Sequence, residues 1–378
     1  MSQRVSQGGL AIPVLRPQLP GAERLLPYLR RIDSARIYSN WGPLSAELEG
    51  RVAERLGVPA CGFSSASSGT AALVGAILAS AGRATPERPL ALIPAFTFVA
   101  TAAAVELCGY DPYLLDVDAN TWMLDPGRVA GHPNLDQVGL VVPVAPFGRP
   151  VPQAGWIAFR DSAEIPVVID GGASFDRLVD GGEEHLGEIP VTLSFHATKC
   201  FATGEGGGVA SRDTGLIRRA GQALNFGFHM TRDSRLPSTN GKMSEYHAAV
   251  GLAELDGWEK KHGAVREVAA SYRRCLAEVG LAGRSVITPE VSASYALFSC
   301  RDAAEAKHIV AGLASSGIDT RRWYGGGLHR HTHLSTVPRD DLTSTDRLAP
   351  TLIGLPLAPD LDEESVAYVV EALARSSR

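Results

Sequence analysis

The sequence contains little lysine, no closely spaced cysteines and no long apolar segment. Its five cysteines are scattered without a Cys-x-x-Cys pair, which argues against a disulfide framework or structural zinc and favours a reducing compartment. No apolar run approaches the roughly 20 residues of a transmembrane helix, and the first residues lack the apolar core of a signal peptide. The net charge of -5 favours neither a nucleic-acid partner nor an anionic membrane. We therefore expect a soluble, cytoplasmic protein.

The composition is that of an ordinary globular enzyme, with 45% hydrophobic and 20% charged residues. A chain of 378 residues is too long for one simple core, so we expect a large domain and a smaller one. The pattern changes after Arg284. We place the large domain, with an N-terminal arm, at residues 1–284 and a smaller α/β domain at residues 285–378.

Short apolar runs alternate with helical segments between residues 68 and 209. Runs bounded by Gly, Pro or Asp are typical of buried strands in a mostly parallel sheet. Their alternation with helices predicts an α/β fold in which helices cover both faces of the sheet. The runs are PLALIP (89–94), VGLVVPV (138–144), IPVVID (165–170) and IPVTLSF (189–195).

Apolar spacing and capping residues predict further elements on either side of this region. They are a helix at 44–56 stopped by Gly57, a long helical stretch from Met243 to about Val279 with a possible break near Gly257, a strand at 295–300, a helix at 302–315 and a final helix capped by Asp362. The final helix has one apolar face, formed by Val366, Val369, Val370 and Leu373.

Lysine occurs at only five positions, and Lys199 is the one best placed for chemistry. It lies in SFHATKCFATGEGGG (194–208), after a strand-like segment and before a glycine-rich loop, and strand ends commonly carry catalytic groups. Unlike arginine, an amine can lose its proton and form an imine with an aldehyde. An isolated lysine beside a turn is more often a solvated loop residue, so this interpretation depends on the surrounding motifs.

Two segments offer groups that could bind a charged cofactor. In SSASSGTAAL (64–73), Gly69 and Thr70 are expected at a helix start, where backbone N–H groups and the helix dipole bind phosphate. A plain helix cap explains the same residues. Asp170 ends the run IPVVID, and a carboxylate there needs a partner such as a pyridinium nitrogen. An aspartate that caps the following turn is the alternative.

Three further features are ambiguous when each is taken alone. Phe96 and Phe98 follow a predicted strand, and one could stack on a flat ring, although core packing explains either. Asn240 precedes a helix in STNGKMSE (238–245) and could simply belong to a polar loop. The alternating histidines of HRHTH (329–333) have no nearby Cys or Asp ligands, so we interpret them as surface histidines and predict no metal site.

Taken together, these motifs resemble those of the DegT/StrS-type aminotransferases of fold type I, which use pyridoxal 5'-phosphate (PLP) to aminate ketosugars, mostly nucleotide-linked ones. The resemblance covers nearly the whole chain, and the order and spacing of the motifs carry it. It includes YSNWGPLSAELE (38–49), SSGTAAL, PAFTFVATA, VVID, SFHATK, GEGG, NGKMSEYHAAVGLAEL, RRWY (321–324) and LIGLPLAP (352–359). The HATK and KMSE forms are most similar to the branch that acts on dTDP-linked 4-ketosugars.

The resemblance implies a fold type I architecture, with a mostly parallel central sheet flanked by helices. It implies a ping-pong reaction, with L-glutamate as the usual amino donor, and a homodimer with shared active sites. The implied roles are a Schiff base with PLP at Lys199, contact with the pyridine nitrogen at Asp170, ring stacking at Phe98, phosphate binding at Gly69, Thr70 and Ser194, and contact with the phosphate of the neighbouring subunit at Asn240.

Two departures from the family pattern leave alternatives open. Ala173 stands where the family usually has a Gln or His near the cofactor's phenolic oxygen, and Gly325, Gly326 and Gly327 are unusual near the sugar-side loop. Lys199 argues against the related dehydratase branch, in which histidine replaces the lysine. A PLP enzyme acting on a cyclitol or another non-nucleotide substrate, or a PLP-binding protein without turnover, remains possible.

Overall fold

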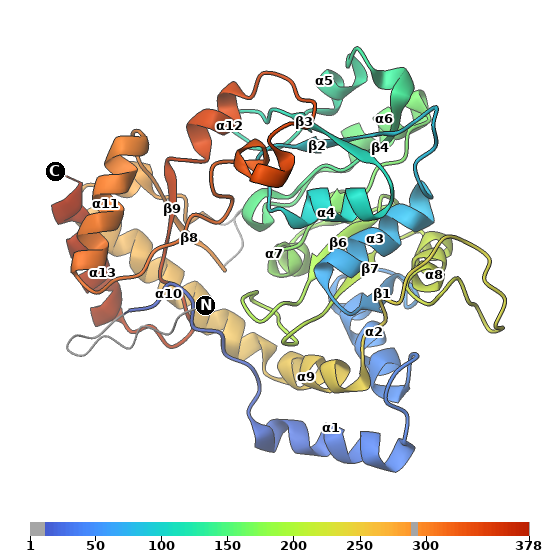
Figure 1. The fold of residues 1–378 in the computed structure, drawn as a ribbon. Coiled ribbons are helices and arrows are strands. Elements are labelled where there is room, and N and C mark those ends of the chain that lie inside the picture. The colour runs from blue at the N-terminus through green and yellow to red at the C-terminus, as the bar shows by residue number, and fades with distance from the viewer. Residues whose placement is uncertain (1–11, 289–293, 378) are drawn as a thin grey trace.

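Two sheets lying edge to edge form the centre of the molecule in the computed structural model, which describes residues 12–288 and 294–377 (Figure 1). Their strand orders are β1-β7-β6-β5 and β3-β2-β4. The bounds are β1 Phe63–Ala66, β2 Leu90–Pro94, β3 Asp111–Leu115, β4 Val138–Val141, β5 Ile169–Asp170, β6 Val191–Ser194 and β7 Gly207–Ala210. Parallel bridges from Val141 to Val167 and from Val144 to Asp170 join the two sheets at β4 and β5.

The pairing is mostly parallel, as predicted. The pairs β2·β3, β2·β4 and β5·β6 are parallel, whereas β7 runs antiparallel to both of its neighbours, β6 and β1. The α-helices in the described part of the chain are α1 Ala22–Ala35, α2 Pro43–Arg55, α3 Gly69–Ser80, α4 Ala100–Leu107, α5 Pro126–Ala130, α6 Ala154–Ala163, α7 Phe175–Asp180, α8 Thr214–Ala223, α9 Glu245–Asp256, α10 Trp258–Glu278, α11 Ala303–Ser315, α12 Thr343–Leu348 and α13 Glu363–Ser376.

Helices cover both faces of the central sheet. Side chains alternate across a strand, and in β2 this sends Ala91 and Ile93 into a core cluster with α3, α4 and α8. Leu92, between them, belongs to a second cluster that includes residues of α2, α6, α7 and α9. The expected α/β fold with a mostly parallel sheet is therefore confirmed.

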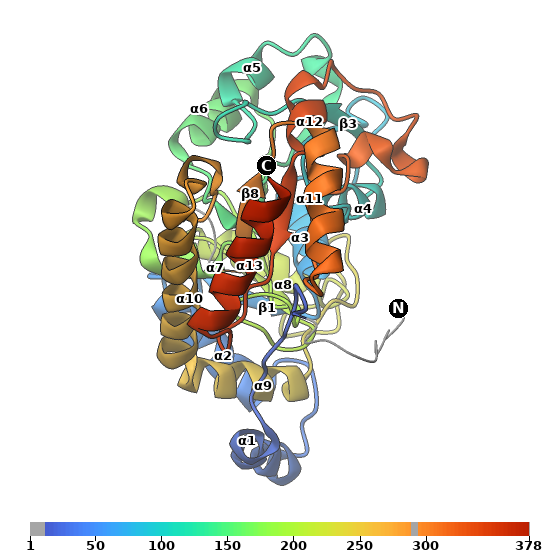
Figure 2. The ribbon, with the colours of Figure 1, turned by 90° about the vertical axis from the view of Figure 1, so that its left-hand side faces the viewer.

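The C-terminal part of the chain forms a separate small sheet. Strands β8 (Ala296–Ser299) and β9 (Leu352–Leu355) pair antiparallel, and α10, α11 and α13 lie side by side over them (Figure 2). This core cluster also contains Tyr272 and Leu276 of α10, so the end of that helix packs onto the C-terminal sheet. The domain boundary after residue 284 stays a prediction.

Most of the predicted elements are observed, and the differences have physical causes. Gly257 ends α9 and precedes α10, which confirms the predicted break, and the Asp362 carboxylate accepts the Ser365 N–H at the start of α13. Strands β1, β3, β7 and β9 were not predicted. The sequences FSSA of β1 and GGVA of β7 carry little strand signal, and their pairing with each other and with β6 makes them strands.

The interpretation of all three HRHTH histidines as surface residues is wrong for one of them. His329 is buried, and its Nε2 lies 2.9 Å from Asp346 Oδ1 because the short helix Leu328–Arg330 packs against α12. His331 is exposed, and His333 pairs with Glu106 at the surface. Among residues 12–288 and 294–377, no helix has the length and apolarity needed to span a membrane, and no group of three His, Cys, Asp or Glu side chains could hold a metal. Residues 1–11, where we expect no signal peptide, lie outside the described residues.

Candidate active site

The carboxyl ends of β5 and β6 bring the predicted catalytic residues to one edge of the sheet. Asp170 is the last residue of β5 and pairs with Thr192 of the parallel strand β6. The chain then leaves β6 at Ser194 and folds back on itself, because Ala197 N–H donates to Gly204 O and Lys199 N–H donates to His196 O. This turn places Lys199 just beyond the strand ends, as the sequence predicts.

The Lys199 amine has a hydroxyl partner and two charged neighbours. Its Nζ donates a hydrogen bond to the Tyr295 hydroxyl at 3.2 Å. Burial lowers the pKa of the Lys199 amine, whereas the negative charge of Asp170 acts in the opposite direction and the positive charge of Arg321 adds to the lowering. A lowered pKa increases the fraction of neutral amine, which is the nucleophilic form of a lysine.

Both oxygens of the Asp170 carboxylate are held in place. Oδ2 accepts a hydrogen bond from the Thr101 hydroxyl at 2.7 Å, and Oδ1 accepts one from the Gly172 N–H at 3.0 Å. The Thr101 hydroxyl lies 2.9 Å from that of Thr97. The bond to Gly172 is the turn contact considered above as an alternative, so Asp170 does cap the turn. The bond to Thr101 fixes the other oxygen, and the negative charge of this carboxylate also acts on the Lys199 amine.

The predicted phosphate-binding residues meet at the start of α3. Ser68 caps this helix by accepting the Ala71 N–H, which leaves Gly69 and Thr70 in the first turn, where N–H groups lack intrahelical acceptors. Gly69 packs directly against Ser194: a Cβ at position 69 would lie 2.6 Å from Ser194 Cβ. The structure thus brings Gly69, Thr70 and Ser194 together at a helix N-terminus, a preferred site for phosphate.

The two phenylalanines of PAFTFVATA have different environments. Phe96 is 1% exposed and packs edge-on against Tyr324, at a ring distance of 5.1 Å, so it is a core residue. Phe98 is 54% exposed, which leaves its ring available for stacking. Together with the buried amine, the oriented carboxylate and the helix N-terminus, an exposed ring on this edge matches the chemical groups of PLP, and we conclude that the cofactor fits these residues.

Two residues of the resemblance remain without a demonstrated role. Asn240 is exposed, and its Oδ1 accepts a hydrogen bond from Lys242 Nζ at 2.6 Å. Its neighbour Gly241 accepts the Ser67 N–H, so this segment lies beside the loop that leads into α3. Ala173 is partly buried and packs against the main apolar cluster, which means that position 173 presents a methyl group instead of a polar partner.

Four further residues surround the amine and the carboxylate, and the sequence analysis assigned them no role. They are Thr101, Tyr295, Arg321 and Tyr324. Thr101, Arg321 and Tyr324 lie within segments already noted for their resemblance, PAFTFVATA and RRWY, so those motifs held a usable signal. Tyr295 opens YALFSC, which indicates only a strand, and no local pattern relates it to Lys199.

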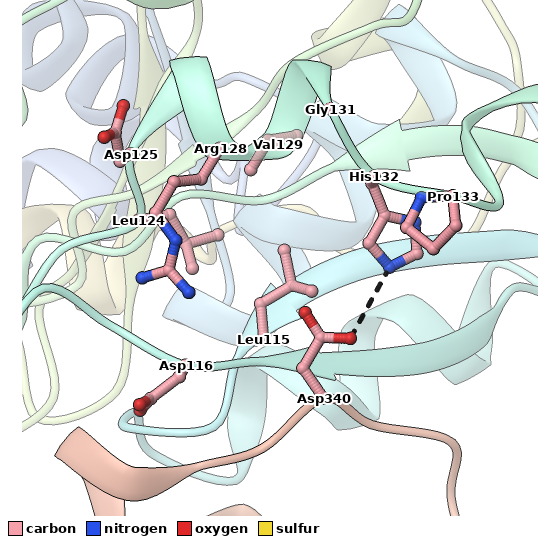
Figure 3. A pocket seen from close by; sticks show the side chains of 10 residues that line it. All are labelled: Leu115, Asp116, Leu124, Asp125, Arg128, Val129, Gly131, His132, Pro133 and Asp340. Atoms are coloured by element: carbon pink, nitrogen blue, oxygen red, sulfur yellow. Dashed lines mark ion pairs between the residues drawn. The ribbon is translucent and has the colours of Figure 1, made fainter.

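A small cavity of about 110 Å³ lies away from these residues, at the end of β3 (Figure 3). Figure 3 shows His132 and Asp340 pointing toward one another, with His132 Nε2 3.9 Å from Asp340 Oδ1. Asp116, also in its wall, accepts hydrogen bonds from Ser344 N–H and from the N–H and hydroxyl of Thr345. Asp116 therefore caps α12 and fixes it to β3, which is a structural role.

A mostly parallel α/β sheet that presents a lysine amine, an aspartate and a helix N-terminus at its carboxyl edge defines a fold type I, PLP-dependent enzyme. Residues 21–374 match the DegT/DnrJ/EryC1/StrS aminotransferase family, and the chain belongs to this family. It is thus an aminotransferase, and its cofactor is PLP.

Named relatives and solved structures agree with this family. "Protein Rv3402c" of Mycobacterium tuberculosis is 33% identical over 370 residues, which are 96% of this chain and 89% of that protein. A dTDP-4-amino-4,6-dideoxy-D-glucose transaminase of Shigella dysenteriae is 26% identical over 95% of this chain and 97% of its own length. The crystal structure of DesI, determined in the presence of its TDP-sugar product, has a TM-score of 0.85 at 28% identity and covers 98% of this chain and 95% of its own.

Proposed function

We propose that this protein transfers an amino group from L-glutamate to a nucleotide-linked 4-keto-6-deoxy sugar, by a ping-pong reaction in which Lys199 holds PLP as a Schiff base. The observation that carries the proposal is that the Lys199 amine and the Asp170 carboxylate lie at the same edge of the sheet. They are close enough for the charge of Asp170 to affect the pKa of Lys199. The substrate class is supported by the transaminase of Shigella dysenteriae and by DesI, both of which are named for dTDP- or TDP-linked sugars.

Bound PLP supplies a ring that accepts the electrons released at the substrate carbon. The residues of this chain then have separate tasks. Asp170, kept in orientation by Thr101 and Gly172, would face the pyridine nitrogen and keep it protonated. Gly69, Thr70 and Ser194 would hold the phosphate, and the exposed ring of Phe98 would stack on the cofactor ring.

Lys199 has two successive tasks. Its amine would hold the cofactor, and once free it would serve as the base and acid that moves the proton of the transfer. Burial lowers the pKa of Lys199, so the released amine is less fully protonated than an ordinary lysine and can accept that proton. A positioned base of this kind typically accelerates a reaction by about 10²–10⁴-fold.

The proposed assembly is a homodimer in which Asn240 reaches the phosphate site of the neighbouring subunit. The segment before Asn240 exposes large apolar side chains, Phe226 at 45% and Met230 at 94%, and exposed apolar surface often marks an interface. We further propose two domains, residues 1–284 and 285–378, and a cytoplasmic location. All five cysteines are free thiols, which suits a reducing compartment.

The function is tested by incubating the purified protein with PLP, L-glutamate and a panel of ketones, and by detecting aminated products by mass spectrometry. The panel contains dTDP- and UDP-linked ketosugars and a keto-cyclitol, and Lys199→Ala serves as the control. The expected result is that the unmodified protein aminates a nucleotide-linked 4-ketosugar and that Lys199→Ala does not. Amination of the cyclitol only would replace the proposed substrate class, and no product with any donor would favour a PLP-binding protein without turnover.

A further inference from the structure

A buried hydroxyl that no motif singled out contacts the reactive amine. The Tyr295 hydroxyl accepts a hydrogen bond from Lys199 Nζ at 3.2 Å, and this nitrogen lies 5.9 Å from the centre of the Tyr295 ring. We propose that Tyr295 is a positioning residue that holds the free amine of Lys199 while the amine is detached from the cofactor, so that Lys199 can carry the proton of the transfer. This inference rests on the function proposed above.

The surrounding aromatic side chains fix the orientation of Tyr295. The residue is 7% exposed and stands immediately before β8. Its ring meets Phe147 edge-on at 5.4 Å and Trp323 edge-on at 5.0 Å. Perpendicular contacts of this kind are favourable, and two of them from different segments restrict rotation of the phenol. The hydroxyl is therefore held toward Lys199.

A neutral phenol can serve the amine in both of its protonation states. Burial raises the pKa of the Tyr295 phenol, so the hydroxyl keeps its proton. It can accept a hydrogen bond from the ammonium form of Lys199 and donate one to the lone pair of the neutral amine. The proton that Lys199 takes from the substrate carbon thus arrives on a nitrogen that stays in place, and it leaves from the same position.

The Tyr295 hydroxyl is the polar contact of Lys199 that a single substitution can remove without changing a nearby charge. Asp170 favours the charged amine and Arg321 opposes it. Burial raises the pKa of the neighbouring Cys200 thiol to about 12, so this group stays protonated and uncharged. The negative charge of Asp176 also raises the pKa of the Tyr295 phenol and that of the Cys200 thiol. None of these groups changes when the phenol becomes a phenyl ring.

Tyr295→Phe removes the hydroxyl and keeps the ring, and Tyr272→Phe is the matched control. Tyr272 is a fully buried tyrosine whose hydroxyl donates to the backbone oxygen of Pro356 at 2.7 Å and not to Lys199. Hydrogen bonds to charged groups are about twice as strong as neutral ones. Loss of the Tyr295 hydroxyl should therefore disfavour the ammonium form and lower the pKa of Lys199 by roughly half a unit to one unit.

The first measurement uses the protein without cofactor. Its amines are labelled with acetic anhydride over a range of pH, and the extent of labelling at Lys199 is followed by peptide mass spectrometry. The labelling midpoint should move to lower pH in Tyr295→Phe and stay unchanged in Tyr272→Phe. An unchanged midpoint in Tyr295→Phe, or an equal shift in both variants, would overturn the inference.

The second measurement uses the PLP-loaded protein and the half-reaction with amino donor, followed as the loss of the cofactor's visible absorbance. In Tyr295→Phe the rate should fall by roughly tenfold or more, and the acidic limb of its pH profile should move in the same direction as the labelling midpoint. A wild-type rate and pH profile in Tyr295→Phe would reject the positioning role. If the unmodified protein reacts with no donor, the proposed function is rejected. The labelling experiment would still test the contact between Tyr295 and Lys199, because it needs neither cofactor nor donor.

Discussion

Asp170→Asn separates the electrostatic role of this carboxylate from its role in the fold. The substitution keeps the shape of the side chain and removes its charge. The amide oxygen can still accept the Gly172 N–H, which now reaches Oδ1 at 3.0 Å. The amide nitrogen takes the place of Oδ2, so the Thr101 hydroxyl, now a donor at 2.7 Å, must turn to accept and can donate to Thr97 at 2.9 Å.

The two expected effects differ in size. Because every hydrogen bond has a replacement, the folding free energy should change only by the loss of charge assistance in two bonds, which is about 2 kcal/mol or less. The reaction loses the group that holds the pyridine nitrogen protonated. We expect the half-reaction with amino donor to slow by about 10³-fold, which corresponds to about 4 kcal/mol of barrier.

The assay measures the decay of the cofactor's visible absorbance after an amino donor is added, and urea unfolding supplies the stability. Asp170 raises the pKa of Lys199, so the substitution should lower that pKa. The lysine then becomes neutral at lower pH, and raising the pH should not restore the rate. Asp116→Asn is the control, because it alters a buried carboxylate that caps α12. It should lower stability without slowing the half-reaction.

A rate for Asp170→Asn within a fewfold of the unmodified protein would refute the reasoning and leave Asp170 as a turn cap. A loss of rate that parallels a loss of folded protein would refute it as well, because the effect would then be structural. Equal slowing by Asp116→Asn would show that the assay reports general destabilisation.

Four further predictions test other parts of the site and fold. Borohydride should fix the mass of the cofactor on the peptide that contains Lys199, and label on any of the other four lysines would contradict the assignment. Gly69→Ala should weaken PLP binding about tenfold or more in a fluorescence titration, a loss of about 1.4 kcal/mol, because its Cβ would lie 2.6 Å from a neighbouring carbon; Gly50→Ala, with no atom within 4 Å, is the control and should bind normally. If Asn240 completes the neighbouring phosphate site, the protein should sediment as a dimer or larger, and a monomer with full cofactor occupancy would exclude this role. Burial lowers the pKa of His262, so the unfolded chain binds more protons below about pH 6.5 and stability should fall from pH 7 to about pH 5; His262→Gln should reduce this fall in urea midpoints, and an unchanged slope would contradict it.

Local chemistry was sufficient to predict much of the fold. The apolar runs that became β2, β4, β5 and β6 are buried whatever their exact partners, so their composition predicts strands. The face of α13 formed by Val366, Val369 and Val370 is buried as its spacing indicates. Lys199 and Asp170 could be found because each stands beside a strand end within a motif. The resemblance of the motifs to the family then linked distant segments that local patterns could not connect.

Long-range packing decided the remaining features. The strand β7, with the sequence GGVA, exists because β6 and β1 supply its hydrogen bonds, and propensity alone does not favour it. Phe96 and Phe98 are two residues apart with equivalent local signals, yet packing buries one and leaves the other exposed. His329 is buried through a partner on α12 that the local pattern does not identify.

The contact between Lys199 and Tyr295 shows the division most clearly. By itself, the sequence determined that Lys199 follows a strand and precedes a glycine-rich loop, because these are properties of neighbouring residues. The two residues are 96 positions apart, and nothing in the composition of either segment specifies that they meet. Only the packing of β8 and its aromatic neighbours against the edge of the central sheet brings the phenol to the amine, since contacts between distant segments depend on how all the intervening elements fold.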